Sequence, residues 1–192
     1  MEDVMAREAV DVAALEAQMT ASADDAFARM EIPRADLEAA DAVLGFSGPW
    51  RFLSNFWRAP GLSAFGIAVP TAEHGYMMAK VDPAHPERWA LVRAIAQAPR
   101  PQDAKRLGRQ APLRPDWDAV KYDFLRAMLA RKFAPGSDLA EKLVATGRRP
   151  LVELNTWGDQ VWGMTERKDG ALVGANALGK LLAERRAQLA GG

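Results

Sequence analysis

Four side chains that can take part in chemistry lie close together in the segment VPTAEHGYMMAK: Glu73, His74, Tyr76 and Lys80. In a helix, Glu73 and Lys80 would share one face, with His74 on the neighbouring face. The helix dipole favours an ionised carboxylate in the first turn, which suits a group that stabilises positive charge or activates water. The same pattern fits a capping glutamate or an ion pair with Lys80, and this segment alone favours that structural interpretation.

Other kinds of chemistry have little support in the sequence. The segment lacks the H-x-x-x-H pair of helical metal sites, the only second histidine is His85, and the chain has no cysteine. A G-x-S-x-G nucleophile turn, a dinucleotide fingerprint and a phosphate-binding loop are absent as well. We therefore expect neither a bound metal ion nor a cofactor.

A second cluster occupies the segment NTWGDQVWG, which contains Trp157, Asp159 and Trp162. Tryptophan is costly to expose, so paired tryptophans in a loop either close the edge of a core or form a wall on which a flat ring stacks. Asp159 could hold a ribose hydroxyl or a developing cation beside such a wall. It could equally be a turn-forming aspartate, and the segment does not distinguish the two.

Two smaller motifs could contact a ligand. Asn55, between aromatic residues in FLSNFW, could supply hydrogen bonds in an apolar pocket, although it also fits an Asx turn. Asn176 precedes the last predicted helix in the pattern Gly174-x-Asn176-x-x-Gly179 and is a natural N-cap. The amides at that helix end could take a phosphate, but a simple cap is the favoured interpretation.

Composition limits the class of protein. The chain has 192 residues, 49% of them hydrophobic, which suffices for one domain with a real core or for one domain with an appendage. The N-terminal sequence MEDVMAREAVDV lacks the basic and apolar regions of a secretory signal, and no apolar run is long enough to span a bilayer. We expect a soluble, cytoplasmic protein.

The formal net charge of zero conceals an asymmetry. Residues 1–44 contain eleven acidic residues and three arginines, whereas the rest of the chain contains 14 acidic and 22 basic residues. A moderately basic body suits a phosphorylated small molecule or a nucleic-acid end, although the charge alone identifies no partner. Residues 1–44 are therefore assigned to an acidic N-terminal extension, and residues 45–192 to the functional domain.

Hydrophobic spacing predicts mostly helices. In the extension, Val12, Leu15 and Met19 have helical spacing, SADD could cap a second helix through Phe27 and Met30, and a third could follow Pro33. Short strands or loops are expected in FLSNFW and FGIAV, and a strand in RPLVELN. Helices are expected over residues 72–81, 86–98, 102–106, 114–134, 135–146 and 176–189. The predicted fold class is α+β: a helix-dominated single domain with a small sheet and a helical N-terminal extension.

Five blocks in a fixed order carry a more specific signal. They are FLSNF, PTAEHGYMMAK, AKRLGR with PLRPDWDAVKYDFLRAMLARKF, LVELNTWGDQVWG and GANALGKLL. Their order resembles the NADAR (YbiA-like) family of riboflavin-intermediate N-glycosidases and ADP-ribose-linked hydrolases, over about residues 45–186. The stretch GMTERKDGALV, between Trp162 and Gly174, is longer and more charged than the short glycine-rich link of the family.

The resemblance implies a compact α+β domain that cleaves N-glycosidic bonds at ribose C1 without a metal. It places the essential glutamate at Glu73, the tryptophan before the long helix at Trp117 and the loop aspartate at Asp159. Cleavage passes through a state with positive charge at C1 and the ring oxygen, which a fixed carboxylate stabilises. Glu73 would take this role and orient the attacking water, while Asp159 would assist through the ribose hydroxyls or as a second carboxylate.

The remaining roles concern the leaving base and the phosphate. Trp117 or Trp157 would stack on the base. Lys80 and Arg109 would bind the 5′-phosphate, with Arg51 as a third candidate, because a guanidinium is well shaped for phosphate. The expected substrate is a phosphoribosylated intermediate of riboflavin synthesis. The alternatives are an ADP-ribosyl hydrolase acting on guanine in nucleic acid and a non-catalytic nucleotide or ADP-ribose binding module; no membrane partner is expected.

Overall fold

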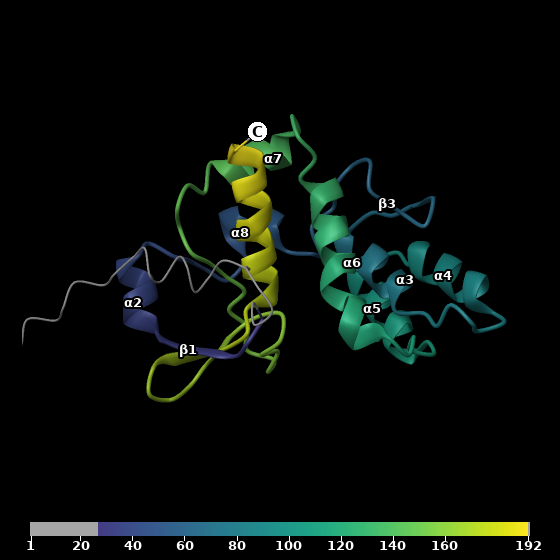
Figure 1. The fold of residues 1–192 in the computed structure, drawn as a ribbon, viewed down its shortest axis with the longest axis horizontal. Coiled ribbons are helices and arrows are strands. Elements are labelled where there is room, and N and C mark those ends of the chain that lie inside the picture. The colour runs from purple at the N-terminus through teal and green to yellow at the C-terminus, as the bar shows by residue number, and fades with distance from the viewer. Residues whose placement is uncertain (1–26, 192) are drawn as a thin grey trace, which may run out of the picture. The chain divides into compact units, whose positions relative to one another are not determined.

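The computed structural model describes residues 27–191, which divide into two compact units (Figure 1). The first unit consists of residues 27–45 and 147–184, and the second of residues 46–146 and 185–191. Helices dominate and the strands form small sheets, which confirms the predicted α+β class. Over the described residues, no helix combines the length and the apolar character that a bilayer crossing requires.

A three-stranded antiparallel sheet forms one part of the first unit. Its order is β1 (Met30–Pro33), β7 (Ala171–Gly174) and β6 (Thr165–Glu166), and in Figure 1 the purple β1 runs beside the yellow-green hairpin. The charged stretch after Trp162 thus forms the β6–β7 hairpin. Helix α2 (Arg34–Ala39) packs Leu37 into the same small core as Ile32 and Leu172.

The helix predicted through Phe27 and Met30 is wrong, because Phe27 lies in a turn and Met30 begins a strand. Burial alternates along β1, with Ile32 inside and its neighbours exposed, which is the two-residue period of a half-buried strand. The helix predicted after Pro33 is confirmed as α2. The helix predicted from Val12 to Met19 lies outside the described residues.

The first unit also contains a short parallel pair, β2 (Val43–Leu44) with β5 (Leu151–Val152), which confirms the strand predicted in RPLVELN. The predicted last helix is confirmed as α8 (Ala177–Ala190). A Cβ at Gly179 would collide with the carbonyl oxygen of Leu151, so the glycine permits the close approach of α8 to β5.

The second unit is largely helical. Its elements are η1 (Gly48–Leu53), β3 (Ser63–Ala64), β4 (Ile67–Ala68), α3 (Ala72–Ala79), α4 (Arg88–Ala96), α5 (Pro101–Gln110), α6 (Trp117–Lys132) and α7 (Asp138–Val144). The helices confirm those predicted in this region, although α5 extends to Gln110 rather than Arg106. Helix α3 packs against α4, α5 and α6, and all of its residues are buried.

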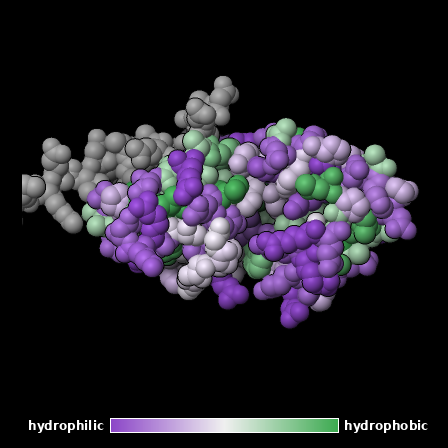
Figure 2. Space-filling view, turned by 90° about the horizontal axis from the view of Figure 1, so that it is seen from below, coloured by the Kyte–Doolittle hydropathy of each residue, from purple (hydrophilic) through white to green (hydrophobic). Residues whose placement is uncertain are grey.

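The segment FLSNFW is not a strand. Its first two residues end the 3₁₀-helix η1, which Pro49 favours at its start, and Ser54 Oγ then accepts a hydrogen bond of 3.2 Å from the Phe56 amide. The segment FGIAV does contain a strand, since β4 pairs with β3 in a hairpin. On the face shown in Figure 2, hydrophilic residues predominate and hydrophobic ones appear in small groups.

Two glycines allow the close packing around α3. A Cβ at Gly108, on α5, would lie 2.7 Å from both Cβ and Sδ of Met77. A Cβ at Gly75, on α3 itself, would lie 2.6 Å from Cε and Sδ of Met128 on α6. These separations are too short for carbon–carbon or carbon–sulfur contacts. A side chain at Gly108 would meet Met77 Cβ, which the α3 backbone fixes, whereas one at Gly75 would require the end of the Met128 side chain to move.

Candidate functional site

The N-terminus of α3 is fixed by side-chain and backbone bonds. Thr71 is the N-cap, as predicted, and its hydroxyl accepts a hydrogen bond from the His74 amide. Glu73 lies in the first turn and is only 5% exposed. Its backbone N–H donates a 3.1 Å hydrogen bond to the carbonyl oxygen of Asn55, which joins the helix start to the loop after η1.

A group of cations surrounds the other end of α3. Burial lowers the pKa of Lys80, and the positive charges of Arg109 and Lys105 lower it further, while the carboxylate of Glu73 raises it. Glu73, Lys105 and Arg109 therefore each lie within electrostatic range of Lys80. Arg109 makes no hydrogen bond or ion pair with residues 27–191, so its guanidinium is available to an anion.

An aromatic wall lies beside these charges. Trp117 is only 8% exposed, its ring centroid is 5.0 Å from that of Tyr76, and Lys80 Nζ lies 5.5 Å from the Trp117 ring centroid. Phe124 stacks on Trp117 at 6.4 Å between ring centroids. Trp117 therefore joins the charged cluster of the second unit through its contact with Lys80.

The loop carrying Asn55 is held in place from α6. Lys132 Nζ donates to the carbonyl oxygens of Ser54, at 2.7 Å, and Leu53, at 3.4 Å. The Oδ1 atom of Asn55 is buried and accepts no hydrogen bond from residues 27–191. A buried acceptor without a donor costs about 1–3 kcal/mol, and a hydroxyl of a bound sugar would satisfy it.

His74, for which the sequence suggested no role, has a structural one. Its Nε2 lies 3.0 Å from the carbonyl oxygen of Ala98, so Nε2 carries the hydrogen and donates it. Its Nδ1 then accepts from the hydroxyl of Thr71 at 2.7 Å. Burial lowers the pKa of His74, an effect that the bond to Ala98 partly offsets and that the charge of Arg58 reinforces. The neutral ring links α3 to the segment between α4 and α5.

Asp159, in the first unit, shapes its own loop. Its Oδ1 accepts hydrogen bonds from the amides of Val161, at 3.1 Å, and Trp162, at 2.9 Å, as in an Asx turn. Asn155 bonds both to the amide and to the carbonyl of Asp159. The turn-forming interpretation therefore describes Oδ1. The other oxygen, Oδ2, makes no hydrogen bond with the described part of the chain.

The two other residues predicted in the first unit differ in exposure. Trp157 is 66% exposed and could stack on a ligand. Asn176 is fully buried, and its side-chain amide donates to the Leu151 carbonyl at 2.8 Å while its Oδ1 accepts from the Glu153 amide at 3.0 Å. These two bonds hold the start of α8 against β5 and the residue after it. The predicted phosphate contact of Asn176 stays a prediction, and the side chain already uses both its nitrogen and its oxygen in these bonds.

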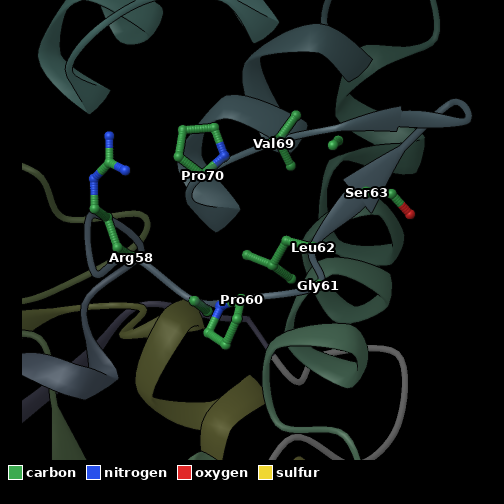
Figure 3. Close-up of a pocket in the computed structure, with 9 residues that line it drawn as sticks. Arg58, Pro60, Gly61, Leu62, Ser63, Val69 and Pro70 are labelled. Carbon is green, nitrogen blue, oxygen red and sulfur yellow. The ribbon is translucent and has the colours of Figure 1, made fainter.

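Two pockets of the second unit lie apart from the Glu73 cluster. One pocket has a volume of about 550 Å³ and lies at the base of the β3–β4 hairpin. As Figure 3 shows, Pro60, Leu62, Val69 and Pro70 form its apolar walls, and Arg58 supplies the charge. None of the predicted site residues lines it. Arg51 lines the other, of about 340 Å³, whose lining residues do not include Glu73, Lys80 or Trp117.

In the second unit the structure thus brings together Glu73, Lys80, Arg109 and Trp117, and it ties the Asn55 loop to Glu73. The sequence analysis missed Lys105, whose Nζ lies 5.7 Å from the ring centroid of Phe56. Its spacing of four from Arg109 in one helix was the available signal. Residues 46–146 and 185–191 contain seventeen lysines and arginines and nine acidic residues, which favours an anionic ligand.

The chain is similar to several known proteins. N-glycosidase YbiA of Escherichia coli (strain K12) is 35% identical over 156 residues, covering 78% of this chain and 90% of YbiA. N-glycosidase Npun_R5314 of Nostoc punctiforme is 36% identical over 148 residues, covering 73% and 86%. Riboflavin biosynthesis protein VVA0006 of Vibrio vulnificus is 31% identical over 140 residues, but only 35% of that protein is covered.

Structure and family comparisons give the same result. The NMR structure of E. coli YbiA superposes with a TM-score of 0.61 at 33% identity, covering 78% of this chain and 83% of YbiA. The model of the NADAR domain matches residues 46–190, which include all five sequence blocks. The chain therefore belongs to the NADAR domain family.

Proposed function

We propose that this protein is an N-glycosidase that hydrolyses the bond between ribose C1 and a ring nitrogen in a phosphoribosylated intermediate of riboflavin synthesis. The observation that carries the proposal is the cluster in the second unit. There, the buried carboxylate of Glu73 and the cations Lys105 and Arg109 each lie within electrostatic range of Lys80. Lys80 in turn lies beside Trp117, a ring that can stack on a base. The names of the curated relatives support the same reaction class.

Each group has a distinct task in the proposed reaction. Glu73 stabilises the positive charge that develops at C1 as the bond to the base breaks, and it orients the water that attacks C1. Lys80, Lys105 and Arg109 bind the phosphate, and Trp117 stacks on the departing base. Asn55 Oδ1 accepts a ribose hydroxyl, which satisfies an otherwise unpaired buried oxygen.

The test measures release of ribose 5-phosphate from phosphoribosylated pyrimidine intermediates by wild type and by Glu73→Gln. Loss of the charge at constant size is expected to lower kcat by about 100- to 1,000-fold. Glu87→Gln, at an exposed glutamate of the same unit, is the matched control and should retain the wild-type rate. Full activity of Glu73→Gln would show that another group carries the reaction, and binding without release by wild type would identify a binding module instead.

A second substrate is favoured by one observation, a row of aromatic residues that leads away from Trp117. Phe124 contacts Phe65 at 6.1 Å between ring centroids, and Arg88 lies between the rings of Phe65, at 5.7 Å, and Trp89, at 4.8 Å. Phe65 and Trp89 are exposed. Exposed rings that alternate with guanidinium groups suit successive nucleic-acid bases, so an ADP-ribosylated guanine in a single strand is the second candidate.

The two substrates are separated by a single comparison. An enzyme that acts on the small intermediate should release ribose 5-phosphate at the same rate in wild type and in the double variant Phe65→Ala/Trp89→Ala. An enzyme that acts on a strand should release ADP-ribose from a modified oligonucleotide, and the double variant should raise its KM by about 10-fold or more, because each stacked base contributes about 1–3 kcal/mol.

A further inference from the structure

The pocket that contains Arg51 has the composition of a ligand site. Its volume is about 340 Å³, and it is formed within the second unit by η1, by the segment at Trp57 and by α7. Pro49, Trp50, Phe52 and Trp57 supply apolar and aromatic surface, and Arg51 and Lys142 supply positive charge. Small-molecule sites combine these features: mainly apolar walls with a few polar groups that orient the ligand.

The aromatic part of the pocket offers exposed ring surface. Trp57 is 37% exposed although it is a large apolar side chain, and burying such a surface under a ligand ring is favourable. Trp50 and Phe52 lie at 6.5 Å between ring centroids with their planes tilted by 48°. The pocket wall therefore holds one indole packed against a neighbouring ring and a second indole open to solvent.

The charged part of the pocket lacks a counter-ion. Arg51 and Lys142 are exposed, and neither forms an ion pair or a side-chain hydrogen bond within residues 27–191. Among residues 27–191, no acidic side chain lines the pocket. Two like charges that line one small cavity repel each other, and an anion bound between them reverses that cost. A guanidinium and an ammonium are also the two groups that proteins use most readily to bind phosphate.

We propose that this pocket is a second binding site, separate from the Glu73 cluster, for a heteroaromatic monophosphate such as a nucleoside 5′-phosphate. The ring lies against Trp57 and Trp50, and the phosphate contacts Arg51 and Lys142. The pocket's volume lies near the lower end of the usual range for small-molecule sites, about 300–1,000 Å³, which suits one mononucleotide. The proposal does not depend on the reaction catalysed at Glu73.

The experiment follows the indole N–H signals of the full chain, labelled with ¹⁵N at tryptophan. The six tryptophans give six signals, which single Trp→Phe variants assign. Titration with AMP should shift the Trp50 and Trp57 signals along one saturable curve. Adenosine retains only the ring contacts and inorganic phosphate only the phosphate contacts. The affinity of the protein for each should therefore be at least about 10-fold lower than its affinity for AMP.

Charge variants separate this site from the catalytic one. In the double variant Arg51→Gln/Lys142→Gln, the affinity for AMP obtained from the Trp57 titration curve should fall by about 10-fold or more. The matched control, Arg93→Gln/Arg131→Gln, removes the same charge from α4 and α6 and should leave the curve unchanged. Unchanged dispersion of the six signals in each variant shows that the fold is retained.

Three results would overturn the proposal. They are the absence of a saturable shift up to about 10 mM AMP, equal affinities in the two double variants, and shifts confined to Trp117, which would place the nucleotide only at the Glu73 cluster. A protein without N-glycosidase activity could still give the expected shifts, so failure of the proposed function and failure of this site are distinguishable.

Discussion

The backbone N–H of Glu73 donates its hydrogen bond to the carbonyl oxygen of Asn55, so the position of the candidate catalytic carboxylate depends on the loop after η1. That loop is in turn held by Lys132, which reaches the carbonyl oxygens of Leu53 and Ser54 from the end of α6. A helix start, a loop and a buried ammonium thus act as one support, and substitutions in any of them are expected to move Glu73.

Asn55→Ala should separate binding from stability. Because Oδ1 is buried without a donor among residues 27–191, its removal should leave the free energy of unfolding unchanged or raise it by about 1 kcal/mol. KM should increase about 10-fold, since a sugar hydroxyl loses its acceptor. Denaturant unfolding and steady-state kinetics measure both quantities, with the exposed Gln97→Ala as control. A loss of stability with unchanged KM would mean that Asn55 serves the fold rather than the substrate.

Two substitutions at Asp159 should distinguish its two oxygens. Asp159→Asn keeps an oxygen that can accept from the amides of Val161 and Trp162, so the turn and the melting temperature should be retained. Asp159→Ala removes this acceptor and should lower the stability by about 1–2 kcal/mol. If the charge assists catalysis, both variants lose activity to a similar extent. An active Asp159→Asn would assign the residue to the turn alone.

The pKa of Lys80 should respond in opposite directions to its neighbours. Arg109→Gln removes a like charge and should raise the pKa of Lys80, whereas Glu73→Gln removes the opposite charge and should lower it further. Because only the ammonium binds phosphate well, the KM of wild type should rise with pH as Lys80 loses its proton, at a lower pH than for an ordinary lysine. Titration of the lysine Nζ signals by NMR measures the shifts, and a Lys80 signal indifferent to both variants would contradict the proposed cluster.

His74 should make the protein less stable in mild acid. Burial lowers its pKa in the folded state below the 6.5 of an exposed histidine, so the unfolded chain takes up a proton that the folded one refuses. The contribution to stability is complete above pH 6.5, falls as the pH drops below that value and levels off beneath the folded-state pKa. Below pH 6.5, His74→Gln should flatten the dependence of unfolding free energy on pH, while His85→Gln serves as the control variant.

Gly108→Ala should destabilise the second unit. Alanine favours helices by about 1 kcal/mol over glycine, but the new methyl group would overlap Met77. Overpacking of this kind costs about 1–3 kcal/mol, and Met77 Cβ is fixed by the α3 backbone. The double variant Gly108→Ala/Met77→Ala keeps the contact with Cβ but removes those with Cγ and Sδ, so its stability loss should be smaller than the sum of the single losses. Additive losses would show that α5 does not press on Met77.

The features that the sequence predicted well are local ones. Thr71 as an N-cap, the helix that follows it and the grouping of Glu73 with Lys80 depend on residues within one or two turns, where propensity and spacing decide. Trp117 lies beside Lys80, the lysine for which a phosphate-binding role was predicted. This contact depends on the packing of α6 on α3, which is not a local feature of the sequence.

The features that the sequence could not predict depend on distant partners. Met30 was assigned to a helix because its strand partner, Gly174, is far away along the chain. Asn176 was interpreted as a cap, whereas its amide bonds to β5, which no spacing rule connects to it. The helix predicted here ends at Arg106, whereas α5 continues to Gln110. The sequence analysis therefore did not place Lys105 and Arg109 one turn apart in the same helix.

The pairing of β1 with β7 also constrains how the chain is made. Residues 46–146 emerge from the ribosome as an uninterrupted stretch, and most of the second unit can begin to fold at once. The first unit cannot, because β1 emerges early and its hydrogen-bonding partner is translated only at residues 171–174. During that interval β1 is an unpaired strand, exposed to wrong partners. Slow translation through the second unit would lengthen this interval. Chaperones that cover exposed strands would reduce the wrong pairing of β1 during it.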